Sequence, residues 1–303
     1  MDFLFNTPNT DYRNQVFYAS GVWKKPIGVT MIQFFLVGAG GGGGGGFLST
    51  GSTATSGGGG GGGGAQTKLL IPAIFLPDEL YVNIGVGGAG GVNGVSGGTT
   101  YVDLINGNNT SATLIAYANG GSGGTYPATG SGTITNGGAG GVVSTAGDTV
   151  YTGLGLFSSV AGGAGGNGSG GTTALAGIST ATSLTSGGGG GGSRNAANTR
   201  GAPAGITGNN VFLPNVTIRT VTNSDFTTYG GVDGVYSVSP FQSYGGAGAH
   251  STSGSNVTTL CGGVGGNGLL GSGGGGGGGN NSACASPGNG GNGGNGFALI
   301  TCF

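Results

Sequence analysis

The sequence predicts an all-β, irregular fold: a small β-sandwich from the N- and C-terminal strands, joined to a bundle of polyglycine II helices. Glycine accounts for 84 of the 303 residues, against about 7% in an average protein. Segments rich in β-branched and aromatic residues flank the glycine-rich stretches, and such residues favour strands. Essentially no α-helix is expected, because glycine costs about 1 kcal/mol at each helical position.

Four uninterrupted glycine runs favour the helix bundle. Polyglycine has no side chain to bury, so it becomes ordered only where its backbone supplies the contacts. Extended helices without Cβ atoms can approach closely enough to pair their N–H and C=O groups laterally. A flexible linker is the competing interpretation, and nine prolines are too few for collagen. The runs are Gly40–Gly46, Gly57–Gly64, Gly187–Gly192 and Gly273–Gly279.

The chain is interpreted as one glycine-rich domain over 1–303. Its β base is expected over 1–37, 67–86 and 297–303, where strand-forming residues are separated by Pro and Gly turns. The helix bundle with its loops is expected over 38–66 and 87–296. Shorter glycine-rich stretches recur between residues 85 and 296 without a fixed period.

The longest glycine-poor segment, 193–244, is interpreted as an insertion in the bundle, with strands expected at 211–222 and 232–238. Its aromatic residues are candidates for contact with a receptor or partner, because binding residues tend to lie on loops held by a rigid scaffold. The alternative is that they form a small core of the insertion itself. The candidates are Phe226, Tyr229, Tyr236, Phe241 and Tyr244.

Charge is scarce, which excludes some function classes. Charged residues make up 5% of the chain and the net charge is −1, so the basic patch of a nucleic-acid binder is missing. The longest apolar stretch, Met31–Val37, is too short to span a bilayer. The start of the chain does not read as a secretory signal, which favours a viral particle assembled inside a cell over an exported cellular protein.

Catalytic and metal-binding patterns are missing from the sequence, so we expect no enzyme activity, no metal and no cofactor. His250 is the single histidine and is expected to be a loop residue. Asp78 and Glu79 are the only adjacent carboxylates and are expected in a polar turn before a strand. Three cysteines match no zinc spacing; free thiols are expected, with one disulfide as the alternative: Cys261, Cys284 and Cys302.

The opening of the chain resembles the glycine-rich domain of many phage tail-fibre and virus structural proteins. That family opens with Trp, a short spacer, Pro-x-Gly, Val-Thr, a strand and then a glycine run, which Trp23, Pro26, Gly28 and the following residues match. The stretches Leu80–Gly91 and Gly290–Phe297 resemble two further landmarks. The resemblance implies a polyglycine-helix bundle, a particle location and distal loops that can touch a host receptor. This sequence departs from the family pattern in two ways. No fibre shaft precedes the opening motif, and the insertion at 193–244 is longer than the usual loop.

These observations together predict a non-enzymatic viral or phage structural protein on a virion surface or tail fibre. Expected partners are other virion or fibre subunits, copies of the same chain, and a host receptor or glycan. A self-assembling extracellular filament protein is the alternative, because apolar terminal strands can add to strands of another chain. An ice-binding protein is disfavoured, because the threonines show no regular three-residue spacing.

Overall fold

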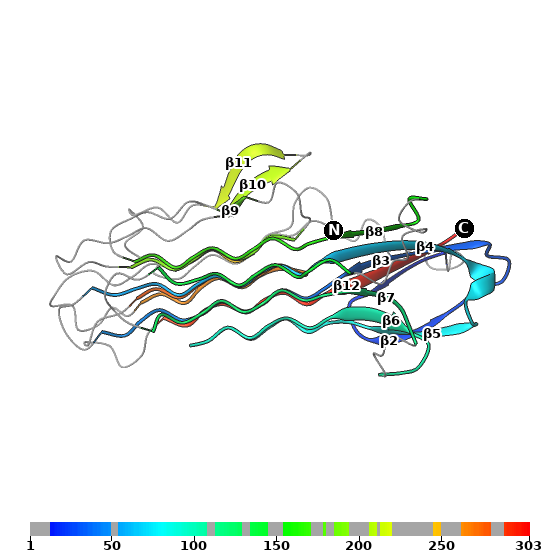
Figure 1. The fold of residues 1–303 in the computed structure, drawn as a ribbon, viewed down its shortest axis with the longest axis horizontal. Helices are drawn as coiled ribbons and strands as arrows, with labels where there is room; N and C mark the ends of the chain where they lie inside the picture. The colour runs from blue at the N-terminus through cyan, green and yellow to red at the C-terminus, as the bar shows by residue number, and fades with distance from the viewer. Residues whose placement is uncertain are drawn as a thin grey trace, which may run out of the picture.

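The computed structural model shows an elongated molecule, with β-sheets at one end and long wavy segments at the other (Figure 1). It describes residues 13–49, 54–107, 113–128, 134–144, 154–170, 178–179, 185–193, 206–210, 213–219, 245–249, 262–279 and 288–303. Among these residues there is no α-helix, and the one helical turn is the 3-10 turn η1 (Ala73–Phe75). The predicted all-β class is therefore confirmed.

The first sheet contains five antiparallel strands in the order β1-β12-β3-β4-β8. The C-terminal strand β12 lies between β1 and β3, with Phe297 opposite Val37 and Thr301 opposite Asn14. The N- and C-terminal strands therefore share one sheet, as the sequence predicts. The bounds are β1 (Asn14–Phe17), β3 (Met31–Val37), β4 (Gln66–Pro72), β8 (Phe157–Val160) and β12 (Phe297–Cys302).

The second sheet contains four antiparallel strands in the order β2-β5-β6-β7 and packs against the first. Its bounds are β2 (Gly21–Lys24), β5 (Glu79–Asn83), β6 (Thr100–Asp103) and β7 (Leu114–Ala118). The sequence prediction assigned 87–296 to the bundle, but β6, β7 and β8 lie in that range and belong to the sheets. These strands are four or five residues long and adjoin glycine-rich stretches. The glycine content of their surroundings therefore outweighs the strand-forming residues in the sequence pattern.

The two sheets enclose an apolar core built by alternating residues. In β3, Ile32, Phe34 and Leu36 are fully buried, whereas the residues between them are half-buried. Leu80 and Val82 face this core from the other sheet. Such alternation is what a strand with one buried face requires. The β base is thus stabilised by burial of apolar side chains between its two sheets.

A third, small sheet has the order β11-β10-β9. It is formed by β9 (Ile178–Ser179), β10 (Ile206–Asn210) and β11 (Leu213–Arg219). The strand β11 lies inside the predicted strand 211–222. The other predicted strand, 232–238, lies outside the described residues.

Strands of the base continue directly into the glycine-rich segments, which run along the long axis of the molecule (Figure 1). The chain leaves β3 into 38–46 and returns through 57–65 into β4. Likewise β5 continues into 84–91, and 92–99 leads back into β6. The sheets therefore fix where each segment starts and which segments lie side by side.

Backbone hydrogen bonds of the first run follow a three-residue period. The N–H groups of Gly40 and Gly43 donate to Gly294 and Gly291, at N···O distances of 2.9 and 2.8 Å. The intervening N–H groups donate to two other segments: Gly41 to Gly62, and Gly42 to Val95. Three successive residues thus point to three neighbours, which is the geometry of an extended helix with three residues per turn.

Three glycine-rich segments form the centre of the bundle: 38–46, 57–64 and 271–279. They hydrogen-bond to one another, as in Gly41 N–H to Gly62, Gly58 N–H to Gly277 and Gly274 N–H to Gly41. Each also bonds to four segments outside this triangle, so each has six neighbours, as in hexagonal packing. The surrounding segments, in order, are 85–91, 92–98, 119–125, 135–141, 162–170, 185–192, 245–249, 262–268 and 288–296.

Glycine is required in the central segments because neighbouring backbones occupy the space of a side chain. A Cβ atom on Gly60 would lie far inside van der Waals contact of the Gly188 carbonyl group, and one on Gly43 would overlap Gly275. Several outer segments, though not 185–192 and 245–249, instead carry a larger, exposed residue at every third position. Examples are Val86 and Ala89 on segment 85–91. Within these segments the side chains therefore recur every three residues, although the stretches themselves follow one another along the chain without a fixed period.

Candidate functional site

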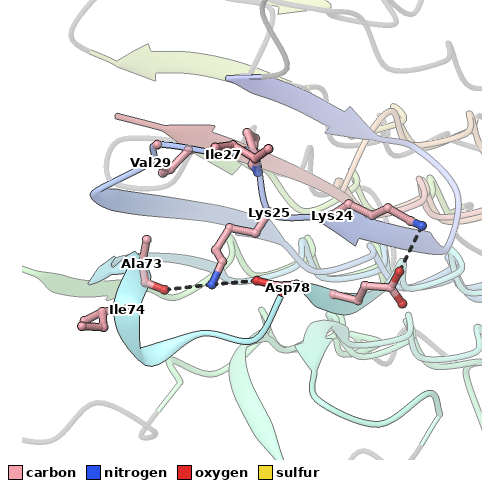
Figure 2. Close-up of a pocket in the computed structure, with 10 residues that line it drawn as sticks. Lys24, Lys25, Ile27, Val29, Ala73, Ile74 and Asp78 are labelled. Carbon is pink, nitrogen blue, oxygen red and sulfur yellow. Dashed lines mark hydrogen bonds and ion pairs between the residues drawn. The ribbon is translucent and has the colours of Figure 1, made fainter.

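The end of the β base farthest from the glycine bundle carries a groove with a volume of 470 Å³ (Figure 2). One wall is the turn between β2 and β3, and the other is η1 with the start of β5. Gly28 has φ +82°, a conformation that favours glycine. The groove is therefore shaped by the Pro26–Gly28 part of the opening motif. Its lining is Lys24, Lys25, Pro26, Ile27, Gly28, Val29, Ala73, Ile74, Asp78 and Glu79.

Lys25 ties the two walls of the groove together. Its ammonium donates to the carbonyl oxygen of Leu76 at 2.7 Å and lies 3.1 Å from Asp78 Oδ1. Its backbone N–H donates to the Asp78 carbonyl at 2.8 Å. The Lys25 side chain is only 22% exposed, so these contacts hold the positive charge in a partly buried place. Lys25 thus has a structural role, because it connects the two walls of the groove.

Two further charges close the rim of the groove, where Lys24 Nζ lies 3.0 Å from Glu79 Oε1 (Figure 2). Asp78 and Glu79 are therefore each paired with a lysine at the start of β5. Asp78 lies in the turn expected there, whereas Glu79 is already the first residue of β5. The groove as a whole is electroneutral, with two lysines and two carboxylates.

Apolar side chains project around this groove into solvent. Ile27 and Ile74 from the two walls and Phe75 from η1 are among the most exposed large apolar residues of the described chain, at 105%, 85% and 71%. Exposed apolar groups gathered at one place indicate a contact surface rather than a reaction centre. This end of the base therefore carries an exposed apolar patch.

Trp23, the first residue of the opening motif, is fully buried in the core of the base. Its ring packs edge-on against Phe34, with centroids 6.4 Å apart and planes at 72°. Trp23 is therefore a core residue that anchors the base. Its Nε1 has no hydrogen-bond partner among the described residues.

The aromatic candidates Phe226, Tyr229, Tyr236, Phe241 and Tyr244 lie outside the described residues, so their contact role stays a prediction. His250, Cys261 and Cys284 also lie outside the described residues, so the loop position of His250 and the free thiols stay predictions. Cys302 is a free, buried thiol on β12, and burial raises its pKa. The described part of the chain contains no cluster of three or more His, Cys, Asp or Glu residues suited to a metal.

Buried hydroxyl groups cap the glycine segments at both ends of the bundle, which sequence reasoning missed. Near the base, the Thr185 hydroxyl donates to the Gly64 carbonyl. At the far end, Thr135 Oγ1 donates to the Gly57 carbonyl at 2.8 Å, and the Ser169 and Ser193 hydroxyls lie 2.6 Å apart. Ser and Thr next to glycine runs were the available signal, since hydroxyls can replace missing backbone partners.

Comparison with known families identifies the class of the chain. A model described as a glycine-rich domain matches residues 17–303. The chain belongs to this glycine-rich domain family. The match begins at the last residue of β1 and includes every later strand and every described glycine segment. A search of curated proteins found no match. Across the described residues, no helix is long and apolar enough to cross a bilayer.

Proposed function

We propose that this glycine-rich domain is a non-enzymatic structural subunit of a virus or phage particle, on the virion surface or a tail fibre. The observation that carries the proposal is the glycine bundle, whose backbones are hydrogen-bonded in three directions into one lattice. Such a lattice makes a stiff rod with very few large side chains. A rod of this kind suits holding loops at a distance from an attachment point.

The end of the base is the attachment point in this proposal. Its groove joins exposed apolar groups, Ile27 and Ile74, to an electroneutral rim. An apolar centre within a polar rim is the usual composition of a protein interface. Other virion or fibre subunits, copies of this chain among them, are the partners that it fits. The opposite end then faces outward, where the loops of the bundle would contact a host receptor or glycan.

Electron microscopy of the purified chain in negative stain, at neutral pH, tests this function. Compact rods that bind a particle or fibre fraction through the base would support it. The double variant Ile27→Asp, Ile74→Asp should then lose this binding and keep the rod shape, because both side chains are exposed. Long regular filaments of the wild type would contradict the proposal and favour a self-assembling filament protein instead.

A further inference from the structure

Three outer segments, 262–268, 288–296 and 85–91, form one flat face of the bundle. The middle segment, 288–296, bonds to two central segments, as in Gly291 N–H to Gly275 and Gly43 N–H to Gly291. In hexagonal packing, its two outer neighbours then lie on opposite sides of it. Both neighbours are joined to it directly, by Gly265 N–H to Asn289 and Gly293 N–H to Gly88.

A ladder of asparagines runs along the middle of this face. Asn289, Asn292 and Asn295 are exposed and spaced by three residues, which at about 3.1 Å per residue is about 9.3 Å. Asn292 Oδ1 accepts the N–H of Gly90, and Asn295 Oδ1 accepts that of Gly87, both at 2.8 Å. Because these N–H donors orient each amide, the Nδ2 donors of Asn292 and Asn295 are left with no bond to a described residue.

Uncharged side chains flank the asparagine ladder on both sides. Val86, which is 72% exposed, and Ala89 lie on one neighbouring segment, and Val264, which is 54% exposed, and Asn267 lie on the other. The three segments contain no charged residue. A ligand that carries charge would lose hydration here without gaining an ion pair, so the face suits an uncharged ligand that offers hydrogen-bond acceptors.

We infer that this face binds an uncharged, proline-rich polypeptide segment in the polyproline II conformation. Such a segment has three residues per turn and the same repeat of about 9.3 Å, and its carbonyl groups have no internal partners. One carbonyl per turn can therefore accept from one asparagine Nδ2, in register along the ladder. Its rings can pack against Val86 on one side of the ladder and Val264 on the other, and its preformed helix loses little conformational entropy on binding.

The size of the face fits one extended chain better than a second copy of this protein. Nine residues span about 28 Å, and hydrogen-bonded backbones lie about 4.8 Å apart, so three segments with their side chains are roughly 15 Å wide. The resulting area of about 400 Å² is half of what each partner buries in a stable protein complex. A single polyproline II helix covers the ladder and reaches the valine on either side of it.

Titration with a capped oligoproline of about twelve residues, followed by backbone amide NMR shifts, tests this binding site. Shifts should gather on 85–92, 262–268 and 288–296. Val86→Asp should weaken binding at least about tenfold, because it places a charge on the face. Val142→Asp is the matched control, since Val142 is 67% exposed on another side of the bundle, and its binding should equal that of the wild type.

No shifts with the wild type, or equal losses in both variants, would overturn the inference. A capped Gly/Ser peptide of the same length should bind more weakly than oligoproline, and equal binding would also count against it. Sedimentation velocity adds the remaining outcome: a dimer that Val86→Asp abolishes, without oligoproline binding, would assign the face to a second copy. The site does not depend on the particle role proposed above, because the face is remote from the groove of the base.

Discussion

The β base and the glycine bundle are stabilised by opposite means although the same chain segments run through both. In the base, side chains such as Phe34 and Leu80 fill a core between two sheets. In the bundle, the central segments carry only the small side chains of Ala39 and Ser272, and backbone groups of neighbouring segments pair in three directions. The comparison teaches that burial of apolar side chains and removal of side chains can each produce a close-packed interior.

The largest expected effect comes from adding a side chain at the centre of the bundle. In Gly60→Val, the new side chain would overlap the Gly188 backbone, so the lattice must open. We expect a loss of more than about 4 kcal/mol in the free energy of unfolding, at the severe end for single substitutions. Urea unfolding followed by the fluorescence of Trp23 measures it.

Gly91→Ala is the matched control for this central substitution. A Cβ atom on Gly91 would meet only the Asn93 carbonyl oxygen, at 3.9 Å. Because alanine also restricts the unfolded chain, stability should stay equal or rise by up to about 1 kcal/mol. Equal midpoints for Gly60→Val and the wild type would refute close packing of the central segments.

The second largest effect is expected in the core of the base. Leu80 is fully buried, so Leu80→Ala should remove about 2–5 kcal/mol through lost burial and a cavity. Ile74→Ala, at a position 85% exposed, should change stability by no more than about 0.5 kcal/mol. Amide hydrogen exchange can then show whether the base and the bundle unfold together.

The central glycine amides should exchange faster in Leu80→Ala than in the wild type, because the strands continue into the bundle and the two regions should unfold together. Amides of Gly60 and Gly61, which bond to Gly166 and Gly274, are the ones to follow. Unchanged exchange at these glycines would show that the bundle unfolds independently of the base.

A smaller effect is expected where side chains support the backbone lattice from outside. Asn292→Ala removes the acceptor of the Gly90 N–H and should cost about 0.5–1.5 kcal/mol. Asn136→Ala is the comparison, because no hydrogen bond joins the Asn136 side chain to a described residue. Thermal unfolding of both variants measures the difference. An equal loss in the two would show that the Asn292 bond contributes nothing to stability.

The smallest expected effect concerns the thiol of Cys302. Burial raises the pKa of this thiol, so the unfolded chain ionises first as the pH rises. The stabilising contribution is complete below the pKa of the unfolded thiol, about 8.5, and is lost as the pH rises through the folded value. The free energy of unfolding, measured with urea from about pH 7 to pH 10, should therefore fall more steeply in the wild type than in Cys302→Ala. Parallel curves would contradict the assigned burial.

The sequence was informative where residues have strong preferences and silent where they have none. The β-formers of Met31–Val37 and Phe297–Cys302 predicted their strands to within a few residues. The groove followed only in part from the opening motif, because η1 and Lys25 meet through tertiary contacts. Strand β6 was missed because Thr100–Asp103 is short and follows a glycine-rich stretch. Which glycine runs are neighbours could not be predicted, because glycines are identical and only the strand order assigns them.

The shared lattice of the bundle also constrains how its length can change. Each glycine segment repeats its bonding after three residues, so a longer rod needs an insertion of three residues, and in every segment at the same height. An insertion in one segment alone would have to bulge out at a loop. Evolution can therefore vary the loops residue by residue, whereas the distance from the base to the far end grows only in whole steps of about 9.3 Å. The length of the domain is therefore restricted to whole numbers of helical turns.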